Sequence, residues 1–253
     1  MTSYERLASV VALVTVGLAL SLVINPPLVW GFIALLVVTT CVGTGQVLRG
    51  SPLTGRGEIG LAVFVLPSLI VLGGFLFLRL PAFAHGAAVA LGLVTTAVLL
   101  GVALYAEDQT SHPGHPRYRR ARLALNLIAW IIAFALFSAI FAPKVRSILS
   151  ATAILVASAL IAAELFRGGG RSSAQPIYVA VVALTLGQVT WALNYWVLGA
   201  LTGGAILLII FYTVTGVIRS YLDGTLALSV LTEHLAVVGV GLVAIAAGGL
   251  WLR

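Results

Sequence analysis

Long apolar stretches, broken at short intervals by prolines, glycines and charged residues, dominate this chain and restrict what it can fold into. Each stretch is about 20 residues long, the length that an α-helix needs to cross the hydrocarbon core of a bilayer. A bilayer core offers no water to backbone N–H and C=O groups, so spanning segments satisfy those groups within helices. The sequence therefore predicts an all-α, polytopic integral membrane helix bundle.

Nine stretches are long enough to be transmembrane helices. They are residues 5–24, 28–47, 59–79, 84–105, 121–142, 147–166, 177–197, 203–222 and 226–252. Breakers such as Pro26-Pro27 and the glycines 168–170 separate them, because proline and glycine end helices. The boundary between the seventh and eighth stretches is the least distinct, since it has no proline and little polarity. The whole of 1–253 is expected to form one transmembrane domain.

Composition and charge agree with this fold class. Hydrophobic residues make up 61% of the chain and charged residues only 8%, against about 25% charged residues in a soluble domain. A net charge of +7 would suggest nucleic acid as a partner for a soluble protein. Here the basic residues fall in short loops, so the expected partners are the lipid bilayer and its anionic head groups, and not nucleic acid. The arginines expected to contact those head groups are Arg117, Arg119, Arg120 and Arg122.

The distribution of basic residues predicts the orientation. Of the 14 lysines and arginines, ten fall on the side of the N-terminus if nine spans alternate, and four fall on the other side. Cytoplasmic loops carry the excess of lysine and arginine in membrane proteins. We therefore expect a multi-pass protein of the cell membrane with a cytoplasmic N-terminus and Arg253 outside.

Two segments of the chain resemble each other. A shift of 118 residues places 59–106 over 177–224 without a gap and aligns pairs such as Gly86 with Gly204 and Thr95 with Thr213. Copies separated by four spans would run parallel, as in transporters repeated about an axis along the membrane normal. The alternative is that two hairpins rich in alanine, leucine and valine match by composition alone.

The seventh and eighth stretches form a hairpin that carries most of the intramembrane polarity. Gln188, Trp191 and Tyr195 share one helical face, because they are spaced i, i+3, i+7. An amide near mid-membrane needs a partner, so we expect this face to point into the protein. Tyr212 and Thr215 on the eighth stretch are the nearest candidates. Together the five side chains would line a cavity, although a solidly packed core would use the same residues.

Ionisable groups within the spans are few, and each is costly to bury. Glu233 and His234 lie in the ninth stretch, Glu164 near the end of the sixth, and Arg219 near the end of the eighth. With Asn126, they are all predicted at a similar depth on the cytoplasmic side, which makes them a candidate polar site. The simpler interpretation is that Glu164 and Arg219 snorkel to the interface, and that Glu233 forms a structural pair with Arg219.

Known catalytic and cofactor motifs are missing. The loop from Glu107 to Pro116 contains His112 and His115, but its prolines and spacing match no closed zinc site. We find no diphosphate-binding aspartate motif, nucleophile elbow or P-loop. Neither a cofactor nor a resident metal is therefore expected.

Three functions remain open at this stage. The first is a permease for a small solute, with or without proton coupling, which rests on the number of spans and the intramembrane polar groups. The second is a non-catalytic accessory or assembly subunit of a membrane complex, which fits the scarcity of buried charge. The third is an enzyme that modifies lipid or isoprenoid, with Glu233 and His234 as a general acid and base.

Overall fold

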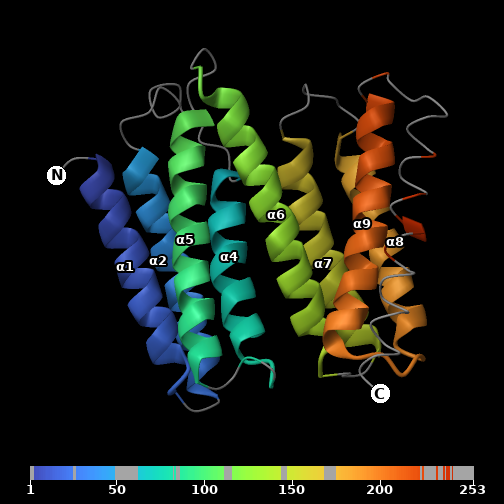
Figure 1. Ribbon diagram of the computed structural model, residues 1–253, viewed down its shortest axis with the longest axis horizontal. Coiled ribbons are helices and arrows are strands. Elements are labelled where there is room, and N and C mark those ends of the chain that lie inside the picture. The colour runs from blue at the N-terminus through green and yellow to red at the C-terminus, as the bar shows by residue number, and fades with distance from the viewer. Residues whose placement is uncertain are drawn as a thin grey trace. The chain divides into compact units, whose positions relative to one another are not determined.

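All regular elements described by the structure, a computed structural model, are helices (Figure 1). It describes residues 3–24, 27–48, 62–81, 83, 86–110, 116–143, 147–167, 175–222 and 224, and the single residues 232, 236, 238, 239 and 241. Seven of the eight helices in these ranges are long and apolar enough to span a membrane. The protein is thus a multispanning, all-helical membrane protein, as the sequence predicts.

The eight helices coincide with the first eight predicted stretches. They are α1 Ser3–Ser21, α2 Leu28–Val47, α4 Ala62–Leu78, α5 Ala87–Thr110, α6 Tyr118–Phe141, α7 Ser147–Phe166, α8 Gln175–Leu193 and α9 Ala200–Leu222. The predicted ninth span falls on 226–252, of which the structure describes five isolated residues. A count of nine is therefore not confirmed.

The predicted repeat is not confirmed either. A shift of 118 residues carries α4 onto 180–196, whereas α8 runs from Gln175 to Leu193. The two helices are thus out of step by several residues under the alignment that the sequence suggests.

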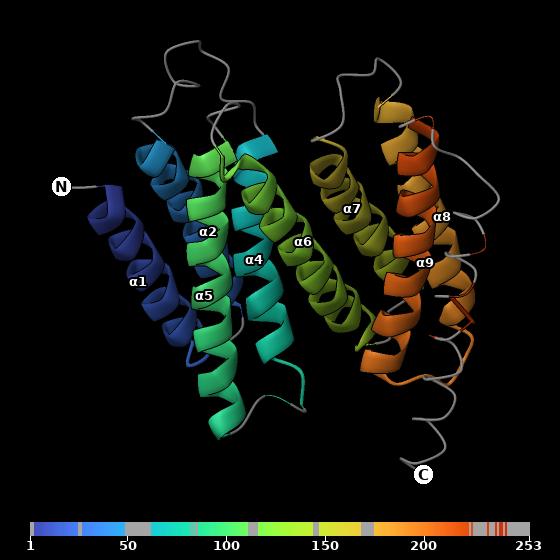
Figure 2. The same cartoon turned by 45° about the horizontal axis from the view of Figure 1, so that its top comes forward.

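The chain divides into two compact units, residues 1–132 and 133–253, and α6 passes from one to the other. In the first unit, α1, α2, α4 and α5 lie side by side in both views (Figures 1 and 2). The first unit has a core of large apolar side chains, among which Leu18, Ile70 and Phe75 are fully buried.

Glycines set the distance between neighbouring helices in the first unit. A β-carbon on Gly43 of α2 would lie 2.7 Å from Cγ1 of Val10 on α1, and one on Gly17 of α1 would overlap Leu36 of α2. Each helix of this pair therefore offers a glycine to a large side chain of the other. Lipid tails are as apolar as leucine, so close packing of this kind is what holds transmembrane helices together.

A half-buried arginine directly after α4 contacts the end of α1. The Arg79 guanidinium donates a hydrogen bond of 3.1 Å to the carbonyl oxygen of Ser21, the last residue of α1. It also lies 4.7 Å from the centre of the Phe75 ring. Because the last carbonyls of a helix have no partner within the helix and carry partial negative charge, an arginine there is favourable.

In the second unit, α6 and α9 meet at glycines in the first turn of α9. A β-carbon on Gly204 would overlap the Ser138 hydroxyl and lie 2.7 Å from the backbone nitrogen of Ser138. The neighbouring Gly203 faces the Phe141 ring in the same way. Since the obstacle at Gly204 includes backbone, which cannot rotate away, this contact requires glycine.

Replacing Gly204 by alanine should destabilise the protein by about 1–3 kcal/mol, because the added methyl group forces α6 and α9 apart. The matched control is Gly101→Ala in α5, where the new β-carbon would make an ordinary contact of 3.7 Å with Val11. That change should be neutral or stabilising by up to about 1 kcal/mol through helix propensity. Thermal unfolding in detergent measures both, and equal melting temperatures for the two variants would contradict the account of the α6–α9 contact.

Candidate functional site

Helix α8 turns its small and aliphatic residues into the second unit and its large polar and aromatic residues outward. Val182, Leu186 and Thr190 are completely buried, and the Thr190 hydroxyl donates to the carbonyl oxygen of Leu186 at 2.7 Å. On the outer side, Trp191 is 57% exposed and Tyr195 is 75% exposed. The orientation of α8 is therefore set by side-chain size, since the small residues pack most closely.

The prediction that Gln188, Trp191 and Tyr195 face the interior is consequently wrong. All three side chains are exposed, whereas Thr215 of α9 is buried. Thr215 needs no partner from α8, because its hydroxyl donates to the Phe211 carbonyl oxygen at 2.7 Å. The five residues do not line one cavity.

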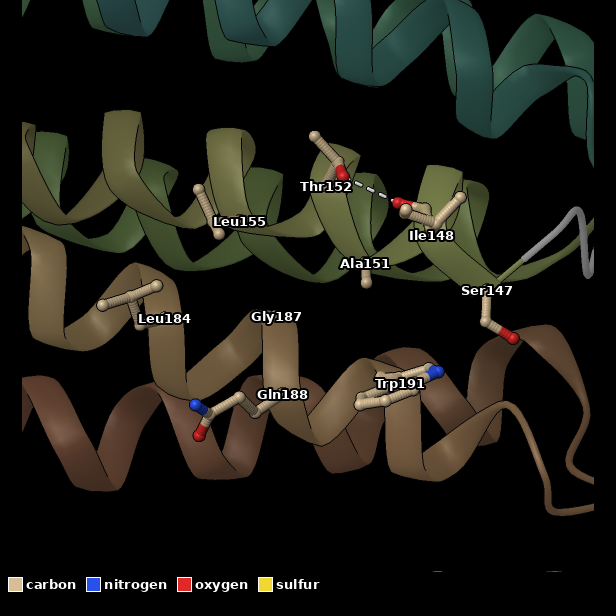
Figure 3. Close-up of a pocket in the computed structure, with 9 residues that line it drawn as sticks. All are labelled: Ser147, Ile148, Ala151, Thr152, Leu155, Leu184, Gly187, Gln188 and Trp191. Carbon is tan, nitrogen blue, oxygen red and sulfur yellow. Dashed lines mark hydrogen bonds between the residues drawn. The ribbon is translucent and has the colours of Figure 1, made fainter.

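The outward face of α8 borders a groove that it forms with α7. The groove has a volume of about 350 Å³ and is open on one side (Figure 3). Its lining residues are Ser147, Ile148, Ala151, Thr152 and Leu155 of α7, and Leu184, Gly187, Gln188 and Trp191 of α8. Gly187 brings the helices close together here, since a β-carbon on it would contact Leu155 at 3.4 Å.

The two ends of the groove lie at different positions along the helices. One end is formed by Ser147, the first residue of α7, together with Trp191, two residues before the end of α8 (Figure 3). The other end is formed by Leu155 and Leu184, which lie further into the two apolar helices (Figure 3). The groove is mostly apolar along its length, with Ile148 near Ser147 at one end and the Gln188 amide toward Leu184 at the other (Figure 3).

Two hydrogen-bonding groups of the groove are unused. The Thr152 hydroxyl is satisfied by the carbonyl oxygen of Ile148 at 2.7 Å. In contrast, neither the Gln188 amide nor the Trp191 indole N–H makes a hydrogen bond within the described part of the chain. Gln188 lies five residues before the end of α8, about 7.5 Å along the helix at 1.5 Å per residue. It thus lies inside the apolar helix and not at its end.

A hydrogen bond closes the polar end of the helix pair. The Asn194 side-chain nitrogen donates to the Ser150 hydroxyl at 2.7 Å, and Ser150 in turn donates to the carbonyl oxygen of Ser147 at 3.2 Å. This contact was not predicted from the sequence. The only sequence feature that pointed to it was the position of Asn194, three residues after Trp191. Interhelical bonds of this kind contribute roughly 0.6 kcal/mol each on average in membranes.

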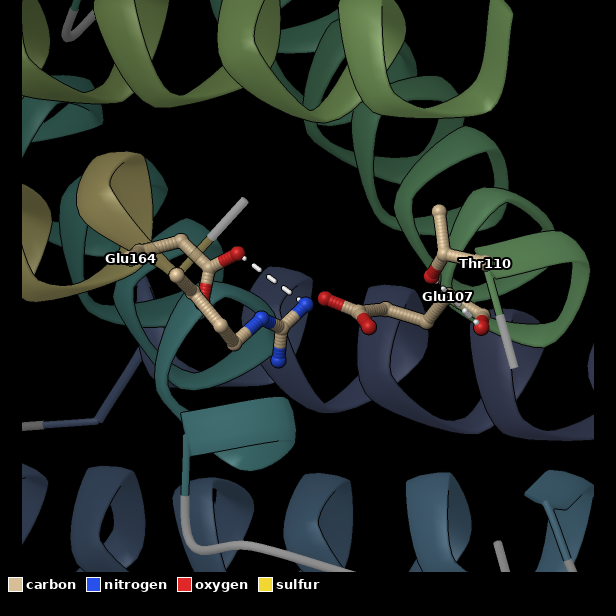
Figure 4. A network of polar contacts seen from close by, with 4 residues as sticks. Glu107, Thr110 and Glu164 are labelled. Carbon is tan, nitrogen blue, oxygen red and sulfur yellow. Dashed lines mark hydrogen bonds and ion pairs between the residues drawn. The ribbon is translucent and has the colours of Figure 1, made fainter. Parts of the chain in front are cut away.

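Two carboxylates are deeply buried, one in each unit. Glu164 of α7 is 3% exposed and pairs with Arg167 at 3.1 Å, one helical turn away (Figure 4). Glu107 of α5 is 2% exposed, and its carbonyl oxygen accepts a hydrogen bond of 3.0 Å from Thr110 (Figure 4). The sequence predicted that Glu164 would snorkel to the interface or join a polar site. It predicted that Glu107 would lie in the loop after the fourth span, whereas the structure places Glu107 in the last turns of α5.

The other predicted polar residues do not form a cluster that the structure describes. Arg219 is exposed in the last turn of α9, and Tyr212 is half-buried on the same helix. Asn126 is half-buried in the part of α6 that belongs to the first unit. Glu233 and His234 lie outside the described residues, so their pairing with Arg219 and the common depth of the group stay predictions.

The described residues contain no group of three or more histidine, cysteine, aspartate or glutamate side chains that could hold a metal ion. All four histidines of the chain lie outside these residues. None of the residues that line the groove is a carboxylate, histidine, cysteine, lysine or tyrosine. The groove therefore has hydrogen-bonding groups but no acid, base or activated nucleophile, which suits it to binding.

One family model matches the chain over residues 7–248, that of the proteins of unknown function called DUF5656. The chain belongs to the DUF5656 family. No match was found among curated proteins or among solved structures. The function of this DUF5656 member is therefore interpreted from the chemistry of its own surface.

Proposed function

We propose that this protein is a non-catalytic membrane protein that binds a lipid molecule in the groove between α7 and α8. The observation that carries the proposal is the groove itself: it is open, lined mainly by apolar side chains with a few hydrogen-bonding groups, and without titratable groups. Of the three functions open from the sequence, this one is closest to the accessory or assembly subunit.

An apolar groove that contains a few hydrogen-bonding groups favours an amphiphile. An acyl or isoprenoid chain fits against Leu155 and Leu184, at the depth where lipid chains lie. The polar part of the same molecule then lies beside Ser147 and Trp191, close to the ends of the helices. Tryptophan is enriched at this level of membrane proteins because its ring is apolar and its N–H is a donor.

The unused donors of Gln188 and Trp191 explain why a specific lipid is favoured over bulk lipid. An amide without a partner in hydrocarbon costs several kcal/mol, which makes its position on an outer face unfavourable unless something binds there. A head-group oxygen of a bound lipid accepts from the Trp191 indole, and a separate oxygen further along the molecule accepts from the Gln188 amide, because the two donors point toward opposite ends of the groove (Figure 3). The lipid thereby provides the hydrogen-bond acceptors that the described residues of the protein do not provide.

The other two functions have less support. A permease rested on the number of spans and on the intramembrane polar groups. Of those groups, Gln188, Trp191 and Tyr195 are exposed, and the Thr215 hydroxyl is satisfied within α9. A lipid-modifying enzyme would depend on Glu233 and His234, which the structure does not describe. Proton coupling through Glu164 is less favoured than a structural role, because Arg167 already pairs with it.

The orientation is also proposed, with the N-terminus in the cytoplasm and the C-terminus outside. Its support is the excess of basic residues on one side, ten of 14. A reporter inserted after Gly224 should report the cytoplasm, and a reporter after Arg253 should report the outside. If both report the cytoplasm, residues 226–252 do not cross the membrane and the number of spans is eight.

The groove can be filled without disturbing the core. Leu184 is 55% exposed and lines the groove, so Leu184→Trp should occupy the space of the lipid chain. Retention of added phosphatidylcholine by the purified protein, measured by native mass spectrometry, should weaken by about tenfold or more, equivalent to roughly 1.4 kcal/mol.

The matched control is Ile177→Trp, which places the same ring on the outer side of α8 at a residue that is 64% exposed and away from the groove. Its lipid retention should stay within about twofold of the original, since a change of that size is under 1 kcal/mol. Equal retention by both variants would remove the support for a lipid site. A change of oligomeric mass with Leu184→Trp alone would assign the groove to a second copy of the chain instead.

A further inference from the structure

The start of α6 carries a separate, positively charged surface. Arg117, Arg119 and Arg120 are all exposed, within four consecutive positions. Tyr118 between them is 37% exposed, so an aromatic ring accompanies the charges. None of these residues belongs to the α7–α8 groove. What is inferred for this surface therefore does not depend on the function proposed for the groove.

The three arginines are not equivalent. Arg117 is held by α5, because its guanidinium donates a hydrogen bond of 3.2 Å to the Tyr105 hydroxyl. Arg119 and Arg120 make no hydrogen bond, ion pair or ring contact within the residues that the structure describes. Their ten guanidinium N–H donors are therefore available, in the planar geometry that binds phosphate through two parallel hydrogen bonds.

An apolar stripe continues from these arginines along the outside of α6. Leu123 is 59% exposed, Leu127 is 62% exposed and Ile131 is 40% exposed. They follow Arg119 at intervals of four residues, so each lies about 40° around the helix from the one before, and consecutive members are neighbours on the helix surface. At 1.5 Å per residue, the stripe from Arg119 to Leu127 covers about 12 Å, which reaches from a head group well into the acyl chains.

From this arrangement we infer that Arg119 and Arg120 bind the phosphate of an anionic phospholipid whose chains lie along Leu123 and Leu127. The charges alone would suit any phosphate, but the apolar stripe directly below them suits only a phosphate that carries hydrocarbon chains. Arg117, fixed by Tyr105, contributes positive potential beside the site. The lipid is identified by its chemistry: a negatively charged head group joined to acyl chains.

The test compares two double variants in nanodiscs that contain phosphatidylglycerol and phosphatidylcholine. Arg119→Gln with Arg120→Gln should weaken the preferential retention of phosphatidylglycerol roughly 25-fold, the change that corresponds to about 2 kcal/mol for two arginines near an anionic surface. The control, Arg6→Gln with Arg219→Gln, removes the same charge from two other exposed arginines and should leave the retention within about twofold.

Loss of phosphatidylglycerol retention to the same extent in both double variants would overturn the inference, because only net charge would then matter. So would displacement of the lipid by millimolar inorganic phosphate, since the site would then recognise phosphate without its chains. If the double variant of Arg119 and Arg120 cannot be purified, each single variant should weaken the retention of phosphatidylglycerol about fivefold. Failure of the Leu184→Trp experiment would leave this result unaffected, because the two surfaces share no residue.

Discussion

A polar group within the hydrocarbon core must find its hydrogen-bond partner in the protein, because neither lipid chains nor water supply one there. Most hydroxyl groups of the described helices obey this rule, although the buried Ser138 hydroxyl has no partner among the described residues. The Thr190 and Thr215 hydroxyls bond to carbonyls of their own helix, and Asn194 bonds to Ser150 across a helix interface. Glu164 pairs with Arg167 one turn away. The rule also explains why the chain forms helices at all, since helices satisfy the backbone within each span.

The amide of Gln188 is one of the groups without a hydrogen bond among the described residues. It lies on an outer face, within the span, with an unused indole donor three residues away. The groove beside it is wide enough for a lipid chain and contains no group that could catalyse a reaction. A bound lipid supplies hydrogen-bond acceptors for the Gln188 amide and the Trp191 indole N–H on this face of α8. For this reason we place the function there and not at the buried carboxylates.

The helix positions could be predicted from the sequence because two physical signals agree. Stretches of about 20 apolar residues match the bilayer, and proline or glycine marks their ends, so the first eight predicted spans coincide with α1 to α9. The same argument could not give the direction in which each helix faces. Apolar residues cover both sides of a membrane helix, one side contacting protein and the other lipid, so hydrophobic periodicity carries little information.

For α8, the orientation predicted from polarity was wrong. We expected Gln188 to face inward because amides need partners, but close packing of small residues such as Ala183 and Gly187 decided the orientation. The contact between Asn194 and Ser150 could not be predicted either, because it joins residues 44 positions apart. The groove depends on that packing and on Gly187, and no motif in the sequence encodes it.

The central claim is that one lipid occupies the α7–α8 groove with its head group at Trp191 and its chain at Leu184. Photocrosslinking in native membranes tests it most directly, with phospholipids that carry a diazirine either next to the head group or near the middle of the acyl chain. The account predicts that the head-group probe labels α7 and α8 near Ser147 and Trp191, and that the mid-chain probe labels them near Leu155 and Leu184. Labelling of α7 and α8 no stronger than labelling of the exposed faces of α1, α2 and α5 would contradict it.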